Sequence, residues 1–415
     1  MWAGRGRRIA GAVLSGLLLL SPMTHAAGGW VIEREERPDS PLLKDRKSIA
    51  LSPVQQEKQQ LALAYQQALQ AEQQRIREHW ASPETSSQSR WITYSPDYSA
   101  KKAVDFERNQ VEISIDGIHD GSRLDFAAMA RKVQTELEDT LGTSLQKAQQ
   151  RDPVQVAVTK AFSSRGGRDD SAETGAELVL KELFTSLRPT ETDVRTRAAA
   201  LMRNASIRYQ ALSASIASVP VNTGKKLTYV IPLPDNRIRR KVLEYKPVVS
   251  RNAQRFNLSE DIIMAIIHTE SHFNPLARSH TPAFGLMQIV PSTAGREASL
   301  KLFQEERLLT PPYLLNPRQN IEVGAAYLSV LYYDYLKDIR DPNSRLYYTI
   351  AAYNGGPSNV AKAFTDKPSL QDAIDTINNL TPDQVLERLL NKAPSEETRL
   401  YVEKVLKRRP FYAKL

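Results

Sequence analysis

The sequence of 415 residues contains no cysteine, and this absence excludes several kinds of chemistry. Without cysteine there is no disulfide framework, no thiolate nucleophile and no cysteine-based metal site. A lipid attached to a cysteine behind a secretion signal is excluded as well, so we expect no lipid anchor in an outer membrane. The absence alone does not restrict the compartment, because proteins without cysteine occur in every one.

Long apolar runs are missing too, apart from one near the start. Arg5, Arg7 and Arg8 precede a mostly apolar run over residues 9–20, and small residues follow at 24–26. This order is typical of a secretory signal, so we predict a signal peptide over 1–26 and a periplasmic location. The run is shorter than the roughly 20 residues that an ordinary membrane span needs. An uncleaved N-terminal anchor is the alternative.

The chain is basic, but its charge is not concentrated in long blocks. The formal net charge is +9 and the pI is about 9.4. Such a balance suits an anionic polymer, which could be nucleic acid, anionic lipid or a cell-wall glycan with acidic peptides. The basic clusters at 237–241 and 404–409 are short, and no nucleic-acid-binding motif is present. We therefore expect no nucleic-acid partner and leave peripheral contact with a membrane open.

The apolar pattern predicts an α+β protein, with a mainly α-helical C-terminal domain behind a smaller α+β domain. Residues 27–90 are expected to form a linker and a Gln-rich helix over 53–80, which we interpret as a spacer, with packing on another surface as the alternative. Residues 91–235 should form the α+β domain, with a hairpin around 107–110 and a strand at 226–232. Helices are predicted in it near 123–147, 173–187 and 191–203. Residues 236–415 should be helical near 237–254, 259–272, 290–299, 319–338, 343–353, 355–364, 369–377, 382–390 and 395–408.

The most informative stretch, residues 259–275, predicts a helix that ends in a carboxylate. Ser259 suits the N-cap, and the apolar row through Ile263, Ile266 and Ile267 continues to Glu270 at helical spacing. A carboxylate on an apolar face is held partly out of water, which raises its pKa. A general acid that works near neutral pH needs this protonated state. Taken alone, Glu270 is explained more simply by an ion pair with a nearby Arg or Lys.

Three further segments favour a catalytic role for Glu270 over a simple ion pair. They are Gly285-Leu286-Met287-Gln288, Ala352-Tyr353-Asn354 and the stretch from Glu397 to Val402. Together with Glu270-Ser271, in this order and at these separations, they resemble the motif series of the lytic murein transglycosylases with a soluble-transglycosylase, lysozyme-like domain. The resemblance covers residues 240–415. Residues 91–96 and 111–115 are similar to the N-terminal domain of the membrane-bound C subgroup, whose lipid-anchor cysteine this chain lacks.

The resemblance implies a role for each motif residue. Glu270 would be the catalytic acid and base, and Tyr353 and Tyr401 would orient it or stabilise developing charge. Spacing does not decide which tyrosine does more. No cofactor and no metal are implied. Substrate contacts would come from Ser271, Ser279, Gly285, Met287, Gln288 and Asn354.

The distribution of acidic residues bears on the reaction. Glycosidases usually use two carboxylates, whereas no Asp or Glu follows Glu270 until Glu297. With one carboxylate, a substrate N-acetyl group would supply the nucleophile. The resemblance implies non-hydrolytic cleavage of the β-1,4 bond between N-acetylmuramic acid (MurNAc) and N-acetylglucosamine (GlcNAc), giving a 1,6-anhydromuramoyl product. Peptidoglycan strands would then be the partner, and no residue identifies a regulatory protein. A muramidase and a non-catalytic peptidoglycan-binding protein are the alternatives.

A metal site is a weaker alternative. His268 and His272 stand four apart on the predicted helix, which is a spacing that metal ligands use. The known zinc motif places its Glu directly after the first His, and Glu270 comes one position later. No third ligand stands out among six histidines, so we expect no metal.

Overall fold

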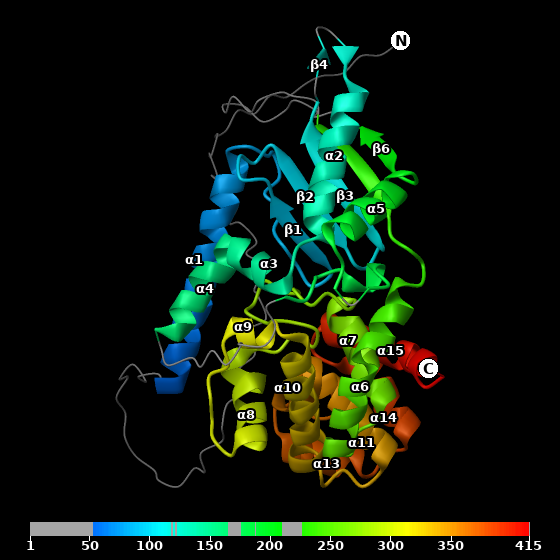
Figure 1. Cartoon of the computed structure of the whole chain (residues 1–415). Coiled ribbons are helices and arrows are strands. Elements are labelled where there is room, and N and C mark those ends of the chain that lie inside the picture. Colours follow the sequence, from blue (N-terminus) through cyan, green and yellow to red (C-terminus); the bar gives the residue numbers. More distant parts are fainter. Residues whose placement is uncertain are drawn as a thin grey trace, which may run out of the picture.

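The computed structural model describes residues 53–117, 119–120, 123–164, 176–186, 188–209 and 226–414. The predicted signal peptide and the linker that follows it lie outside these residues. Figure 1 shows a sheet with covering helices above a domain made of helices, and a long helix along one side of the molecule. The predicted α+β class, with a mainly helical C-terminal domain, is confirmed.

The sheet is antiparallel and has the strand order β1-β2-β3-β7-β6. Its hairpin between β2 and β3 turns over residues 106–109, since Asp105 pairs with Gln110, and this confirms the predicted hairpin. Val111, Ile113 and Ile115 alternate along β3 and are fully buried, which fixes the register. The strands are β1 Arg90–Tyr94, β2 Ala100–Asp105, β3 Gln110–Asp116, β6 Ser206–Tyr209 and β7 Lys226–Pro232, with a separate short pair, β4 His119–Asp120 and β5 Arg123–Leu124.

Helices α2 Phe126–Leu141 and α5 Glu191–Met202 cover one face of the sheet (Figure 1). The predicted helix over 123–147 is two helices, because Ser144 caps a new one, α3 Leu145–Arg151. A further helix, α4 Pro153–Ser163, was not predicted. The predicted helix near 173–187 is wrong over 176–186, where the chain forms only a 3-10 turn at Lys181–Leu183. There Val179 and Leu180 are both buried, and consecutive buried residues do not suit a one-sided helix.

The Gln-rich helix, α1 Pro53–Arg77, is packed against the rest of the protein. Leu61, Tyr65, Leu69 and Ile76 form a buried stripe at helical spacing. Three of them, together with residues of α4, belong to the same apolar cluster as the C-terminal helices. The interpretation of α1 as a spacer is therefore wrong, because its thin apolar stripe is matched by partners distant in the sequence.

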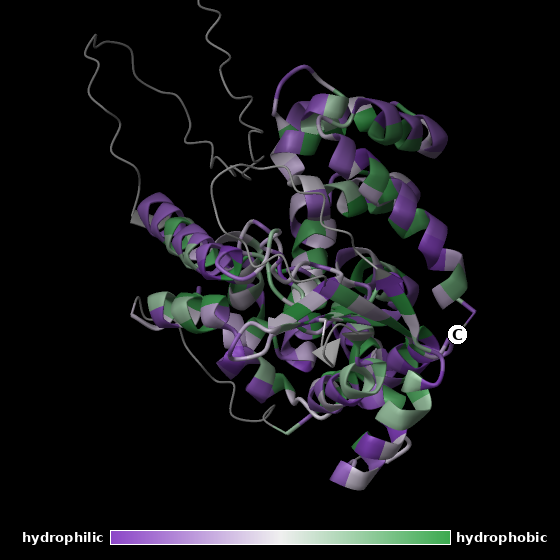
Figure 2. Ribbon diagram, turned by 90° about the horizontal axis from the view of Figure 1, so that it is seen from above, coloured by the Kyte–Doolittle hydropathy of each residue, from purple (hydrophilic) through white to green (hydrophobic). Residues whose placement is uncertain are grey.

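The C-terminal domain surrounds helix α7 Glu260–Ser271, whose residues from Ile262 to Ile267 are all buried. Figure 2 shows hydrophobic residues in the interior and hydrophilic residues along the outer helix faces. None of the described helices combines the length and apolar composition needed to cross a membrane. The other helices are α6 Arg237–Phe256, α8 Arg296–Phe303, α9 Pro311–Leu314, α10 Pro317–Ser329, α11 Pro342–Gly355, α12 Pro357–Val360, α13 Leu370–Ile377, α14 Pro382–Lys392 and α15 Glu396–Tyr412.

Two of the helices predicted in the C-terminal domain, near 290–299 and 319–338, contain a π-helical turn at one end. A π-type turn at Pro291–Gly295 precedes α8, and another at Val330–Tyr335 follows α10. Such π-type turns occur often near functional sites.

Candidate active site

Glu270 lies in the last turn of α7 and is only 7% exposed. Helix α7 packs between α6 and α15, so its apolar sequence is explained by neighbours on several faces. The chain turns sharply just beyond Glu270, because His272 and Phe273 both adopt positive φ. The carboxylate is thus held at the end of a buried helix, beside the loop that follows it.

The surroundings of Glu270 favour its protonated form. Burial raises its pKa to about 8 from an ordinary 4.5, contact with the Tyr401 hydroxyl acts in the opposite direction, and the Glu397 carboxylate raises it further. Among the described residues, no cation contributes to this pKa. Glu270 is therefore neutral at pH 7 and can act as a proton donor.

The two predicted catalytic tyrosines both lie beside Glu270. The Tyr353 hydroxyl donates a hydrogen bond of 2.8 Å to the carbonyl of Met287. The Tyr401 hydroxyl is buried and has no partner of standard hydrogen-bond geometry in the described part of the chain, although it lies near enough to Glu270 to influence its pKa. Burial and the nearby Glu270 raise the pKa of both tyrosines well above the usual range. Both hydroxyls therefore stay protonated.

A tight turn over residues 284–288 supports the site from the opposite side. Gly285 has φ +77°, and a Cβ there would lie 2.2 Å from the Leu314 carbonyl oxygen, so this position requires glycine. Asn320 fixes the turn by accepting from the Met287 amide at 2.7 Å and donating to the Phe284 carbonyl at 2.8 Å. The turn directs the Met287 carbonyl toward Tyr353.

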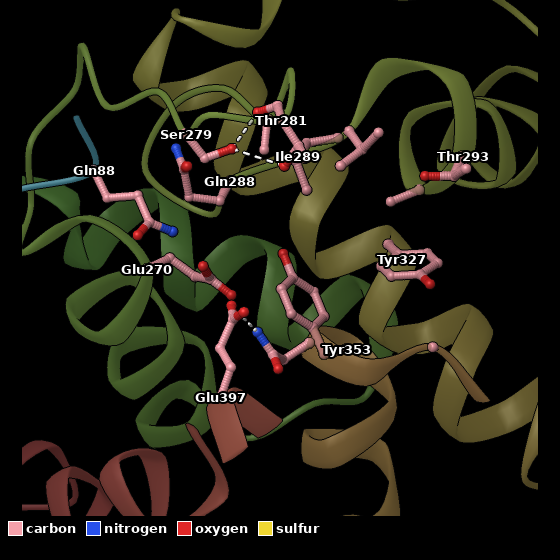
Figure 3. A pocket seen from close by; sticks show the side chains of 15 residues that line it. Gln88, Glu270, Ser279, Thr281, Gln288, Ile289, Thr293, Tyr327, Tyr353 and Glu397 are labelled. Carbon is pink, nitrogen blue, oxygen red and sulfur yellow. Dashed lines mark hydrogen bonds between the residues drawn. The ribbon is translucent and has the colours of Figure 1, made fainter. Parts of the chain in front are cut away.

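A cavity of about 110 Å³ opens beside Glu270 (Figure 3). Of the residues predicted to contact substrate, Ser279, Gln288 and Asn354 line it together with Tyr353. Gln288 has φ +48°, and its amide nitrogen donates to the Gly285 carbonyl at 2.9 Å. Its amide oxygen is buried and has no hydrogen-bond partner among the described residues.

Three of the predicted substrate contacts do not line the cavity. Ser271 is fully buried, and its hydroxyl donates to the Ile267 carbonyl at 2.9 Å. Gly285 makes room for backbone and Asn320 rather than for a sugar. The Met287 side chain is fully buried against Gly324, where any Cβ would clash with its sulfur at 2.3 Å. Gly285 and Met287 shape the turn, Ser271 bonds within α7, and the Met287 carbonyl is the part of the turn that reaches Tyr353.

Other residues of the cavity were not predicted. A second carboxylate, Glu397, approaches from α15, and Asn354 donates to it at 3.2 Å. The expectation of a single carboxylate in the site is therefore wrong, since the sequence separates residues that the fold brings together. The position of Glu397, one helical turn before Tyr401, was the signal that could have found it. The other lining residues that were missed are Gln88, Thr281, Ala283, Ile289, Val290, Thr293, Ala294, Tyr327 and Gly356.

The two histidines of α7 are engaged by other side chains. His268 Nδ1 lies 2.7 Å from the Tyr412 hydroxyl, and His272 Nε2 lies 3.2 Å from Arg408. Burial and the Arg408 charge lower the pKa of His268 to about 3 and that of His272 to about 4. In the part of the chain that the structure describes, no group of three His, Asp or Glu side chains could hold a metal ion.

Comparison with known proteins places this site in a known domain. A family model described as "Transglycosylase SLT domain" matches residues 247–375, which include Glu270, Gln288 and Tyr353. The chain is 40% identical over 175 residues to membrane-bound lytic murein transglycosylase C of Pectobacterium atrosepticum, covering 42% of this chain and 48% of that protein. It is 40% identical over 197 residues to the protein of that name from Actinobacillus pleuropneumoniae, covering 46% and 52%. The chain thus spans about half the length of these relatives.

Two solved structures of similar proteins are described as lytic transglycosylases. One is an inactive mutant of the lytic transglycosylase Slt from Pseudomonas aeruginosa, 31% identical, with a TM-score of 0.31 over 42% of this chain and 25% of that one. Another is a 70-kDa soluble lytic transglycosylase in complex with bulgecin A, 27% identical, with a TM-score of 0.34 over 43% and 25%. Residues 247–375, which lie within the C-terminal helical part of this chain, therefore match the transglycosylase SLT domain.

Proposed function

We propose that this protein is a lytic murein transglycosylase, which cleaves the β-1,4 MurNAc–GlcNAc bond of peptidoglycan without consuming water. The observation that carries the proposal is Glu270, a buried and neutral carboxylic acid beside a cavity within an SLT domain. The names of the similar proteins agree with this activity. The residues present need no cofactor for the steps below.

In the first step Glu270 acts as the general acid. It gives its proton to the glycosidic oxygen as the bond from that oxygen to C1 of MurNAc breaks, and GlcNAc leaves with a free 4-hydroxyl. The carbonyl oxygen of the MurNAc acetamido group bonds to C1 in its place. A pKa of about 8 keeps the required proton on Glu270 at neutral pH.

In the second step the ionised Glu270 acts as the base. It removes the proton from the C6 hydroxyl of MurNAc, whose oxygen bonds to C1 and displaces the acetamido oxygen. The product is a 1,6-anhydromuramoyl end, and Glu270 is protonated again. No water enters this balance.

The two tyrosines serve different forms of Glu270. The proton of Tyr353 is already donated to the Met287 carbonyl, so its oxygen is an acceptor that can orient the neutral acid. The Tyr401 proton has no such partner among the described residues, and its contact lowers the pKa of Glu270. Tyr401 is therefore the group that stabilises the carboxylate formed between the two steps.

Sugar contacts come from the polar groups that face the cavity. The free amide oxygen of Gln288 can accept from an acetamido N–H or a hydroxyl. Asn354 is held by Thr398 at 2.9 Å and by Glu397, so it is positioned before a substrate arrives. With a basic signal-like segment at 1–26, we place this activity in the periplasm.

One observation favours a second candidate, a hydrolytic muramidase. Glu397 supplies a second carboxylate, which a hydrolase could use to activate water. Figure 3 draws Glu397 beside Glu270, whereas the two carboxylates of a glycosidase flank the bond from opposite sides. Glu397 is also exposed and bonded to Asn354. We therefore assign it to the polar surroundings of Glu270.

Product chemistry tests the proposal. Purified sacculi are digested with the protein or with its Glu270→Gln variant, and the soluble products are analysed by mass spectrometry. We expect muropeptides one water lighter than hydrolysis products from the wild type, none from the variant, and no effect of excess chelator. Reducing-end muropeptides would instead identify a muramidase, and no product from either protein would favour a binding protein.

A further inference from the structure

The wall of the cavity contains one residue from outside the C-terminal domain. Gln88 lies in the loop before β1 and lines the cavity with Glu270 and Ser279. Figure 3 draws its side chain extended toward Glu270, on the side of Glu270 that faces away from Tyr353. The family model starts only at residue 247, so the domain match does not include this residue.

The backbone around Gln88 is fixed by contacts on two sides. Asn274, which is fully buried just beyond α7, donates to the Gln88 carbonyl at 3.1 Å, and the Arg278 amide donates to the Ser87 carbonyl at 3.4 Å. On the sheet side, the Phe106 amide donates to the Ser89 carbonyl at 2.8 Å. These bonds join the loop both to the segment that follows α7 and to the β2–β3 hairpin.

The side chain of Gln88, in contrast, is exposed and its amide has no hydrogen-bond partner within the described ranges. A polar side chain on a fixed backbone, directed into a cavity, contributes nothing to the fold through that amide. It is therefore free to bind a ligand. A primary amide both donates and accepts, which matches the acetamido and hydroxyl groups of an amino sugar.

We infer that Gln88 is a substrate-positioning residue, which binds the amino sugar on the side of the scissile bond away from Tyr353. This inference rests on the proposed function. It also implies that the N-terminal region forms part of the substrate site, through a side chain whose backbone the two domains hold jointly. Removal of the side chain should weaken substrate binding much more than it slows the chemical steps.

Kinetics on soluble, uncross-linked peptidoglycan strands tests this in the full mature chain. Gln88→Ala should raise KM about three- to tenfold, the range expected for one lost neutral hydrogen bond, with kcat changed less than twofold. Gln74→Ala, an exposed glutamine of α1 outside the cavity, is the matched control and should behave as the wild type. Thermal unfolding of all variants should be unchanged, because the Gln88 amide has no internal partner.

A charged variant gives a second readout that a purely structural role would not alter. Gln88→Glu keeps the length of the side chain but places a carboxylate near Glu270, which disfavours the ionised form of Glu270. The basic limb of the kcat/KM profile should then move to higher pH, and KM should rise as well. Unchanged KM in Gln88→Ala together with an unchanged limb in Gln88→Glu would overturn the inference.

Failure of the proposed function is recognised separately, since the wild type would then release no anhydromuropeptides. In that case calorimetric binding of a chitin tetrasaccharide decides the inference. Weaker binding by Gln88→Ala than by the wild type and Gln74→Ala would support it. Equal binding by all three proteins would overturn it.

Discussion

Two glutamates of this protein are buried to a similar degree, yet their surroundings differ. Glu182 lies between the two domains, 3.1 Å from Lys241 and 3.6 Å from Arg237, with both cations almost completely buried. Burial lowers the pKa of Lys241, but Glu182, Tyr245 and Glu244 more than offset this and raise it overall. The described groups that interact electrostatically with Glu270 are the hydroxyls of Tyr401 and Tyr353 and the carboxylate of Glu397, and no cation is among them.

The comparison shows that partners, rather than burial, decide what a buried carboxylate does. Glu182 is the anion shared by Lys241 and Arg237 in an ion-pair cluster, completed by Glu244, that joins η1 of the N-terminal domain to α6. Arg237 extends this connection, because its guanidinium donates to Asn109 at 2.6 Å and to the Phe106 carbonyl at 2.8 Å. Glu270 has no cation to stabilise its charge, so it keeps its proton and is suited to chemistry.

The same substitution should therefore have opposite effects at the two sites. Glu182→Gln leaves two buried cations without their shared anion and should lower the free energy of unfolding by about 3–5 kcal/mol. Urea unfolding at pH 7 measures this change. An unchanged midpoint would mean that Glu244 and water compensate for the lost charge, and the comparison would fail at this site.

Glu270→Gln should stabilise the protein, increasingly as pH rises. The unfolded chain loses the Glu270 proton near 4.5, whereas the folded protein keeps it up to about 8, so the wild type loses stability between these values. Glutamine does not titrate, so the variant avoids this loss, which should reach roughly 2–4 kcal/mol at pH 8. Urea unfolding of both proteins at pH 5 and pH 8 checks it. If the variant and the wild type differed in unfolding free energy by the same amount at both pH values, the raised pKa of Glu270 would be contradicted.

The pH dependence of activity should report the same group. Glu270 must carry its proton in the first step, so kcat/KM should fall about tenfold per pH unit above a limb near 8. The buried histidines should not contribute near neutral pH, because the pKa of His268 is lowered to about 3 and that of His272 to about 4. A limb near pH 6 would point to a histidine and would exclude Glu270 as the acid.

The features of the Glu270 site could largely be predicted from the sequence, because they depend on residues within short segments of the chain. The row of isoleucines on α7 predicted the helix, the burial of Glu270 and the direction of its pKa shift. The tyrosines Tyr353 and Tyr401 were also predicted at the site, from motif residues on α11 and α15. Periodicity within α7 is sufficient for the first of these predictions, since neighbours within a helix are fixed by helical geometry. The two tyrosines were predicted from the resemblance to the lytic murein transglycosylases.

The rest depends on contacts between residues that are distant in the sequence. Tyr65 of α1 donates to the Ser279 carbonyl at 2.6 Å across 214 positions, so the helix predicted as a spacer supports the loop beside the cavity. Glu397 and Gln88 reach the cavity from opposite ends of the chain for the same reason. Met287 is buried because Gly324 leaves room for it, a fact that no pattern around Met287 contains.

The smallest expected effect concerns Tyr401. Its hydroxyl partly counteracts the rise in the pKa of Glu270 that burial causes. Tyr401→Phe removes the hydroxyl that lowers the pKa of Glu270, so the basic limb of kcat/KM should move to higher pH. The maximal rate should fall roughly tenfold, since the carboxylate formed between the two steps loses its donor. Stability should change little, because this buried hydroxyl has no partner of standard geometry among the described residues.

Tyr353→Phe is the matched control for this change. It leaves the Met287 carbonyl without its donor and should cost about 1 kcal/mol of stability. Because the Tyr353 proton is directed at Met287 rather than at Glu270, the basic limb should move less than in Tyr401→Phe. The opposite order of the two shifts, measured on the same soluble strands, would assign the stabilisation of the Glu270 carboxylate to Tyr353. The hydroxyl that stabilises the ionised form of Glu270 would then be the one beside the 284–288 turn rather than the one on α15.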